Sequence, residues 1–482
     1  YWPMRSDPYG IADETARAGK PKFRLTNDHS WPPAPRGEFA SGVIGDAHAQ
    51  LRSLNGSMDR SSWPEARLPR VHQVAEAAAV LQTAGARVTA AAVDVVAYYK
   101  QFGRQSREWH RNCAVTKDGF IVDERCCFGS AADATKCARV SSLLVHRARK
   151  ALQRFDAAHP SRDPKVVEWL RQRRAAGEAL GCSDVEIVER WACMHALGMY
   201  VDDAGLVSVD DAVFDSSGAP VMRHGVQLTR AWAHFEILKA SLAEMGLETT
   251  KEQPPTSVLT LLGVEIDLGT RRMRVSDDKR VKYAERASAV AGLAVVDRDE
   301  FLGLLGRLNF AATFYPRGRQ WLHAPWRAVR AQYRTATDQV VISKAVREQL
   351  RLWVTELEKP DHEGVPIGAA EAFPAAASPE VSAIYADAAL ECAGAGFCAW
   401  TVDGDELLYA QGEWSSAERE SYLICDLELA ASTFGLVALA TETGRNFVYS
   451  FTDNVVAMEA MRRATPRTET MQALCGARSA WL

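Results

Sequence analysis

The sequence lacks the features that mark membrane, secreted and zinc-binding proteins. None of the apolar runs in its 482 residues is long enough to span a bilayer, and no signal-peptide pattern follows the first residue, Tyr1. Its ten cysteines include no Cys-x-x-Cys pair matched by a second one, so we expect reduced thiols in an intracellular protein and no zinc site. Because the chain begins with Tyr rather than Met, we expect it to be a fragment or a piece of a longer polyprotein.

Net charge is also small, at −4, which taken alone argues mildly against a nucleic-acid binder. The distribution of charge is more informative than the total. Residues 271–334 hold fourteen Lys and Arg against six Asp and Glu, a local excess of eight positive charges. A solvated helical face gives the same pattern, but a surface that follows a phosphate backbone requires it.

A Tyr-Val-Asp-Asp sequence at residues 200–203 lies between two apolar runs, residues 194–199 and 206–209. Adjacent carboxylates repel each other, and this repulsion is relieved when they hold divalent cations. Sites with two such cations drive phosphoryl and nucleotidyl transfer. The alternative is an ordinary hairpin turn, because Asp-Asp-Ala-Gly is also favourable turn chemistry.

A third carboxylate, Asp94, lies inside an apolar stretch at residues 90–99 that we predict to be a buried strand. A buried Asp must be neutralised, paired or bound to metal. If this strand pairs with the hairpin at residues 200–203, Asp94, Asp202 and Asp203 converge on one pair of metal ions.

The remaining pattern predicts an alternation of helices and strands, without internal repeats or long low-complexity tracts. A Pro- and Gly-rich start is followed by helices and short strands up to residue 268, and residues 280–357 are largely helical. Residues 369–379 are rich in Ala and Pro and are typical of a linker. The predicted elements are helices at 74–81, 131–155, 164–194 and 228–245, and strands at 22–26, 112–115, 120–122, 258–268, 383–386, 394–401, 406–411 and 446–451.

The serial order of these motifs resembles the reverse transcriptases of retroelements. The residues that carry the resemblance are Asp94, Phe128-Gly129, Tyr200-Val201-Asp202-Asp203 and Leu262-Gly263-Val264-Glu265-Ile266-Asp267. It implies an α+β fold of the right-hand polymerase type, with fingers and palm over residues 1–268 and a basic, helical thumb or connection over residues 269–367. The segment around residues 160–190 is longer than in the family and is expected to be a helical insertion. Residues 301–310 with 316–319 resemble DIRS-type retrotransposons.

The same resemblance implies roles for single residues. Asp94, Asp202 and Asp203 match the catalytic metal ligands. The residues that match the family's nucleotide-binding positions are Lys22 and Arg24 for the triphosphate, Tyr99 for exclusion of a ribose 2′-hydroxyl, Phe128 and Gly129 for template and nucleotide, and Lys251 for protonation of the leaving pyrophosphate. The alternatives are a core aromatic for Tyr99, a surface strand for Lys22 and Arg24, and an exposed loop lysine for Lys251. The Pro that usually follows the Phe-Gly turn is absent.

After a linker at residues 368–379, residues 380–482 resemble a ribonuclease H domain. Asp387, Glu428 and Asp453 match the acidic residues that hold its two metal ions, whereas a lone carboxylate at a strand end is usually a cap. The fourth carboxylate of the family has no counterpart before Leu482. We therefore expect this partial domain to be truncated at its C-terminus.

The resemblance implies an RNA-directed DNA polymerase with two Mg²⁺ or Mn²⁺ ions per active site and an attached ribonuclease H-like domain for the RNA strand of hybrids. Its partners would be an RNA or DNA template with a primer and deoxynucleoside triphosphates, with no membrane involved. The alternative function is a catalytically decayed remnant that keeps the fold and still binds nucleic acid. A telomerase-like host polymerase fits less well, because it does not carry an adjoining nuclease-like domain.

Overall fold

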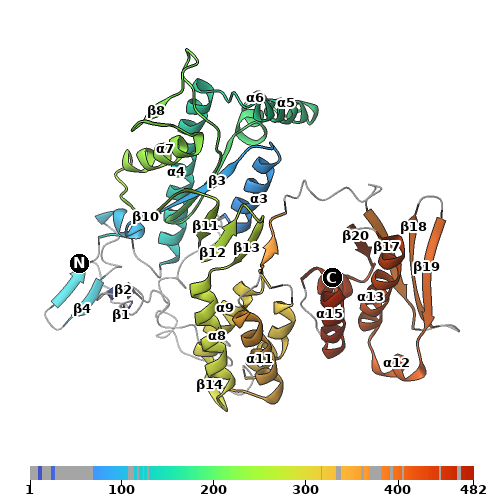
Figure 1. The fold of residues 1–482 in the computed structure, drawn as a ribbon. Coiled ribbons are helices and arrows are strands. Elements are labelled where there is room, and N and C mark those ends of the chain that lie inside the picture. The colour runs from blue at the N-terminus through green and yellow to red at the C-terminus, as the bar shows by residue number, and fades with distance from the viewer. Residues whose placement is uncertain are drawn as a thin grey trace. The chain divides into compact units, whose positions relative to one another are not determined.

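A computed structural model describes most of the chain beyond residue 68 (Figure 1). Its contacts divide the chain into two compact units, residues 1–262 and residues 263–482, which we describe separately. Both units combine helices with largely antiparallel sheets, so the predicted α+β class is confirmed. The described residues are 9–13, 23–27, 69–106, 113–116, 119–122, 124–126, 130–315, 317–332, 338–359, 363–368, 381–390, 395–403, 406–444, 447–463 and 468–481.

The first unit is organised around a four-stranded antiparallel sheet in the order β10-β3-β7-β6. Its strands are β3 (Val88–Val95), β6 (His195–Tyr200), β7 (Asp203–Val209) and β10 (Thr249–Thr256). Strands β3 and β7 are buried along nearly their whole length, because helices cover both faces of the sheet. These helices are α3 (Val71–Gln82) on one face and α4 (Ala131–Ala158) with α7 (Arg230–Ala243) on the other.

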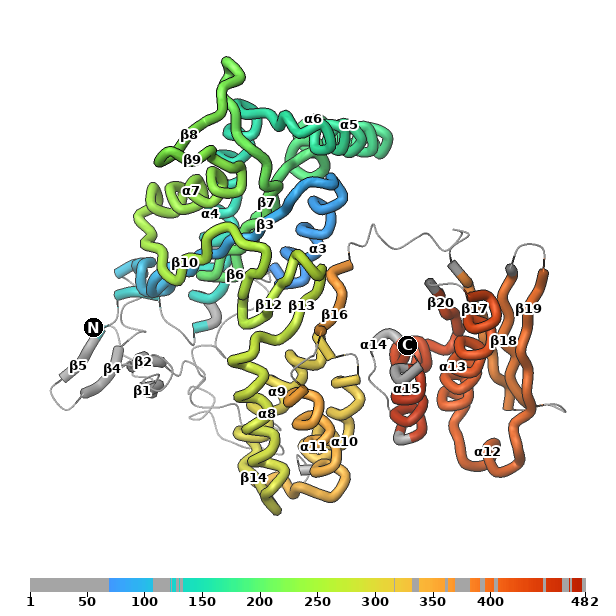
Figure 2. Tube along the Cα trace, in the orientation of Figure 1, coloured from blue at the N-terminus to red at the C-terminus, as the bar shows by residue number. Residues whose placement is uncertain are grey.

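Two glycines allow α3 to approach the sheet closely. Gly198 of β6 and Gly205 of β7 are paired in register and face Val74 of α3. A Cβ atom on Gly205 would lie 2.8 Å from a methyl group of Leu261, which is closer than packed side chains allow. The absence of side chains here lets the hairpin strands pack tightly beneath α3 (Figure 2).

The predicted helix over residues 164–194 is interrupted in the structure. Gly181, with a φ of 74°, ends the first segment, and Ser183 with Glu186 forms a capping box that starts the next. The insertion thus consists of α5 (Pro164–Ala179), α6 (Asp184–Glu186) and the π-helix η5 (Ile187–Trp191). The other elements of this unit are β1 (Tyr9–Asp13), β2 (Phe23–Asn27), the 3₁₀ helix η3 (Tyr98–Gln101), β4 (Cys113–Thr116), β5 (Gly119–Val122), β8 (Met222–Arg223), β9 (Val226–Gln227) and β11 (Val258–Leu261).

In the second unit, the segment before the predicted linker is mainly helical. Its elements are β12 (Val264–Asp267), β13 (Arg272–Val275), α8 (Asp277–Ala291), β14 (Val295–Asp297), α9 (Arg298–Ala311), η6 (Gly318–Leu322), α10 (His323–Gln332), β15 (Gln339–Val341), α11 (Lys344–Glu358) and β16 (Val365–Pro366). Most of the predicted linker, residues 369–379, lies outside the described residues.

The C-terminal segment forms a second four-stranded sheet, in the order β19-β18-β17-β20. The predicted three-stranded meander is confirmed as β17 (Val381–Ala388), β18 (Gly396–Asp403) and β19 (Glu406–Glu413). The fourth strand, β20 (Phe447–Phe451), runs parallel to β17 and continues the sheet at its other edge. The accompanying helices are α12 (Ser416–Ser421), α13 (Ile424–Thr443), α14 (Val455–Arg463) and α15 (Glu469–Trp481).

Helix α13 qualifies the expectation that no segment could span a membrane. Among the described helices it alone is long and apolar enough to do so by length and composition, but 67% of its most apolar stretch is buried. Gly435 lies so close to β18 that a Cβ there would be 2.4 Å from the Cβ of Ala399. Its apolar character is therefore that of a core helix packed on a sheet (Figure 1).

Candidate functional site

The register of the first sheet places the three acidic residues of the predicted polymerase site along one line. Asp94 of β3 pairs directly with Asp203 of β7, and Asp202 is the preceding residue in the hairpin turn. The backbone N–H of Val95 donates to the carbonyl oxygen of Asp202 at 3.0 Å. Directly opposed residues in antiparallel strands have Cβ atoms about 4.5–5.5 Å apart, so the strands bring Asp94 and Asp203 together, with Asp202 next to Asp203 in the turn.

The turn that carries Asp202 is strained. Tyr200 pairs with Asp203, so the turn has two central residues, and the first, Val201, has a φ of 57°. A β-branched residue in this region costs about 1–3 kcal/mol, and glycine is the usual occupant of such a position. The hydroxyl of Ser141 on α4 donates to the carbonyl oxygen of Val201 at 2.8 Å, which holds the turn in place. Strain of this kind persists where the surrounding structure imposes it, and it clusters at functional sites.

Lys251 lies beside Asp94, and its predicted role in protonating the pyrophosphate stays a prediction. Thr250, which precedes Lys251 in β10, pairs with Asp94 of β3. The ammonium group of Lys251 forms an ion pair with Oδ2 of Asp94. The Lys251 side chain is 75% exposed, whereas that of Asp94 is only 13% exposed. The ammonium group therefore neutralises the largely buried carboxylate of Asp94 from the solvent side.

Among the described residues, two groups of acidic or histidine side chains have ligand atoms that all lie within 4.8 Å of one another. The set of Asp94, Asp202 and Asp203 is not one of these two groups. The strands therefore align the hairpin carboxylates without gathering them as tightly. Their donor atoms are all carboxylate oxygens, which suit hard cations such as Mg²⁺ or Mn²⁺.

Of the other predicted nucleotide-binding residues, the structure describes the side chain of Tyr99 alone. Tyr99, on η3, is 8% exposed and packs in the core beneath the sheet, and burial raises the pKa of its hydroxyl to about 12. This is the position of the core aromatic that was the alternative interpretation. Arg24 belongs to β2, whose side chains are not described. Lys22, Phe128 and Gly129 lie outside the described residues.

The first tight group is the predicted acidic triad of the C-terminal domain. Asp387 lies near the end of β17, Glu428 in the second turn of α13, and Asp453 just after β20, and their carboxylate oxygens are within 4.8 Å of one another. Asp387 and Asp453 are exposed, whereas Glu428 is 4% exposed. Burial, and next the charge of Asp387, raise the pKa of Glu428 to about 7. A bound divalent cation would relieve this repulsion, so the residues fit a magnesium or manganese site.

Asp426, which shares α13 with Glu428, has a different role. Its carboxylate accepts a hydrogen bond from the backbone N–H of Leu423 at 3.1 Å and another from the hydroxyl of Thr468. It is buried and caps the helix. Of the two acidic residues in this part of α13, Glu428 is thus the one that faces Asp387 and Asp453.

The second tight group was missed by sequence reasoning. Asp156 of α4 accepts hydrogen bonds from His195 Nδ1 at 3.0 Å, His234 Nε2 at 2.9 Å and the guanidinium of Arg230 at 2.7 Å. Arg230 also donates to Asp211 at 2.6 Å. Because a guanidinium already binds the same carboxylate oxygen as His234, we interpret the group as an ion network rather than a metal site.

The network holds the open end of the β6–β7 hairpin, and Asp202 lies in the turn at the other end. His195 begins β6, and Ser208 of β7, its partner in register, hydrogen-bonds to His234 at 3.0 Å. Burial alone would raise the pKa of Asp156, but hydrogen bonds from the two histidines outweigh it and hold that pKa far below its usual value. Burial also lowers the pKa of His234, with partial compensation by Asp156. His195, Arg230 and His234 lie 39, 74 and 78 residues from Asp156 along the chain, so no local motif reveals the network.

Neither family models nor curated proteins match the chain. Solved structures of foamy viral protease-reverse transcriptase are similar to it at low identity. The complex with an RNA/DNA hybrid is 12% identical with a TM-score of 0.44, and the alignment covers 98% of this chain and 49% of that one. The dRH form with double-stranded DNA is 12% identical with a TM-score of 0.43, covering 98% and 62% of the two chains. The chain thus spans about half to three-fifths of the length of these relatives, and at these values the likeness assigns no site and no activity.

Proposed function

We propose that this chain is an RNA-directed DNA polymerase of a retroelement that adds deoxynucleotides to a primer, with an attached ribonuclease H-like domain. The observation that supports this most directly is the register of the first sheet, which sets Asp94 opposite Asp203 beside the strained turn at Val201 and Asp202. Nucleotidyl transfer with two cations needs carboxylates gathered in one place, and paired strands that meet at a turn can supply them.

In this proposal Asp94, Asp202 and Asp203 hold Mg²⁺ or Mn²⁺ ions. Two bound ions supply charge neutralisation for the triphosphate and activation of the primer hydroxyl. Lys251 and a bound cation would compete for the same carboxylate of Asp94. Once released from Asp94, the ammonium group of Lys251 could donate a proton from Nζ to the departing pyrophosphate.

The basic segment at residues 271–334 contributes less free charge than its composition indicates. Several of its cations are paired, including Arg274 with Glu265 and Arg286 with Glu300. Exposed arginines remain at positions 307, 317 and 330, on or beside α9, η6 and α10. We propose that these arginines bind template or primer phosphates, an interaction that weakens steeply as salt rises.

The C-terminal domain is proposed to hold a second pair of cations between Asp387, Glu428 and Asp453. Their mutual proximity and the raised pKa of Glu428 support this role. The substrate would be the RNA strand of a hybrid, because the domain is attached to a polymerase that makes hybrids.

The proposal is tested by Asp202→Asn in a primer-extension assay on an RNA template with Mg²⁺, beside a filter-binding assay. We expect extension to be abolished and binding to be retained, because Asn keeps the shape of the turn and loses the charge. Asp184→Asn, an exposed change at the start of α6, is the matched control and should extend normally. Extension by Asp202→Asn near the wild-type rate would refute the site, and binding without extension by the wild-type chain would favour the decayed remnant.

A further inference from the structure

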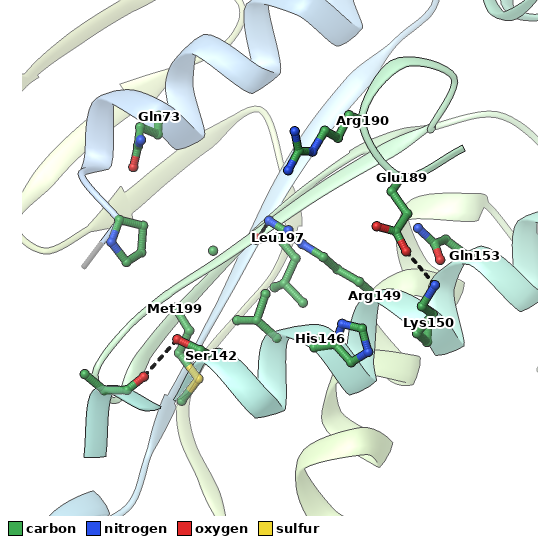
Figure 3. Close-up of a pocket in the computed structure, with 14 residues that line it drawn as sticks. Gln73, Ser142, His146, Arg149, Lys150, Gln153, Glu189, Arg190, Leu197 and Met199 are labelled. Atoms are coloured by element: carbon green, nitrogen blue, oxygen red, sulfur yellow. Dashed lines mark hydrogen bonds and ion pairs between the residues drawn. The ribbon is translucent and has the colours of Figure 1, made fainter. Parts of the chain in front are cut away.

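A cavity of about 450 Å³ lies beside the edge strand β6, between α3 and α4 (Figure 3). One face of α4 supplies much of its wall, through residues spaced three or four positions apart. Its volume falls in the range of about 300–1,000 Å³ that is usual for small-molecule sites. The side chains that line it include His146, Arg149, Lys150, Glu189, Arg190 and Met199.

The cavity is positively charged in a chain whose net charge is −4. Arg149, Lys150 and Arg190 face it, against one acidic residue, Glu189, which leaves two net positive charges with His146 neutral. Glu189 is paired with Lys150 at 2.6 Å. Arg190 is exposed and forms no ion pair within the part of the chain that the structure describes. Figure 3 shows Arg149 from α4 and Arg190 from η5 extending from different walls into the same space.

These groups match the chemistry of a phosphate. Guanidinium groups present several N–H donors in a fixed plane, which suits phosphate oxygens better than an ammonium does. Arg149 uses part of its donor set on the backbone oxygen of Leu197, and burial lowers its pKa. An anion in the cavity would compensate this partly desolvated charge on a side chain that remains exposed overall. The apolar side chains of Val145, Leu197 and Met199 form a wall against which a sugar or base can pack.

We propose that this cavity binds a phosphate group, carried either by a free nucleotide or by a nucleic-acid backbone. The site is separate from the acidic line at Asp94 and Asp203, and it extends beyond the proposed polymerase function. Met199 in its wall immediately precedes Tyr200, so a bound ligand contacts the strand that leads into the hairpin turn. The alternative is a non-specific, solvated basic face of α4, whose binding of anions would not depend on Arg190.

The test is a titration of the full chain in EDTA, so that neither acidic site binds nucleotide through metal ions. One arm uses ATP and the other a twelve-nucleotide DNA single strand, each followed by fluorescence or calorimetry. Arg190→Gln is expected to weaken binding about tenfold, as for loss of one charge-assisted contact. Arg154→Gln, on α4 but outside the cavity, is the matched control and should leave affinity unchanged.

A second variant is expected to raise the affinity for the phosphate ligand rather than lower it. Glu189→Gln removes the acidic residue of the cavity and frees Lys150, so we expect binding about three- to tenfold tighter. A gain in affinity cannot come from misfolding. Loss with Arg190→Gln in the ATP arm identifies a nucleotide site, and loss in the DNA arm alone identifies a backbone site. Equal effects of Arg190→Gln and Arg154→Gln, or no tightening with Glu189→Gln, overturn the proposal.

Discussion

At the scale of single residues, the hairpin site shows how the chain tolerates carboxylates in a buried sheet. Like charges placed directly opposite each other on neighbouring strands are destabilising, and Asp94 and Asp203 are such a pair. Lys251 offsets part of this cost by pairing with Asp94 from an exposed position on β10. The chain thus supplies its own cation at a place where the proposed function requires a metal ion, and the two compete for Asp94.

Glu428 gives a prediction at the same scale. Its pKa of about 7 lies above the ordinary value near 4.5, so the folded state favours the protonated acid and loses stability as pH rises between these two values. We expect Glu428→Gln to raise the free energy of unfolding at pH 8 without divalent cations by roughly 1–3 kcal/mol. The same variant should lose the stabilisation that Mg²⁺ gives the wild-type chain. Chemical denaturation with and without Mg²⁺ measures both effects.

The matched comparison is Asp426→Asn, two residues earlier on α13. Asp426 caps the helix and bonds to Thr468, so this change should cost about 1 kcal/mol regardless of Mg²⁺. If both variants responded to Mg²⁺ in the same way, Glu428 would not be a metal ligand in the sense proposed.

At the scale of elements, the network around Asp156 ties together α4, α7 and both strands of the hairpin. His195 and Ser208 fix the open end of β6 and β7, while the strained turn at Val201 closes the other end. Buried polar contacts therefore hold one end of the hairpin strands, and the turn with Asp202 closes the other. Loss of one partner of a buried pair typically costs about 3–5 kcal/mol, because the other charge is left without compensation.

The network predicts a pH dependence of stability. The folded pKa of His234 lies below its ordinary value near 6.5, so the unfolded chain binds an additional proton as pH falls below that value. The free energy of unfolding should therefore fall on acidification from pH 6.5 to pH 5, by at most about 1.4 kcal/mol per pH unit for this proton. Asp156 adds to the loss only at much lower pH, because its folded pKa is depressed from an already low value.

Urea unfolding at several pH values measures this slope. His234→Gln should reduce the slope below pH 6.5, whereas His224→Gln should leave it unchanged, since His224 is exposed in the β8–β9 turn. An identical slope in all three proteins would show that His234 does not titrate differently on folding.

What the sequence could predict at this scale follows from how local each signal is. The hairpin at Tyr200–Asp203 and the strand around Asp94 are short patterns of apolar residues interrupted by acids, and the structure has both. The end of that strand was missed, because Ala97 adopts a φ of 46° and a 3₁₀ helix begins at Tyr98. The network around Asp156 joins residues far apart in the chain, and only the fold reveals that they meet.

At the scale of the whole molecule, the chain divides into two compact units after residue 262. The predicted fingers and palm end at residue 268. The hairpin acids lie in the first unit, and the triad of Asp387, Glu428 and Asp453 lies in the second. Each acidic group draws all its members from one unit. If each group acts as proposed, its chemistry is therefore expected to survive loss of the other.

This independence is the last prediction. On an RNA template with a DNA primer, Asp202→Asn in the full chain should stop extension but leave Mg²⁺-dependent cleavage of the RNA strand intact. Asp387→Asn should have the reverse effect, because it removes an exposed carboxylate of the second group and touches no residue of the first. Gel analysis with separate labels on primer and template follows both reactions in one sample. Asp210→Asn, at a carboxylate paired with Arg87 away from both groups, controls for the loss of an acidic residue as such. If either of the first two variants lost both reactions while still binding the hybrid, the two acidic groups would not be separate catalytic sites.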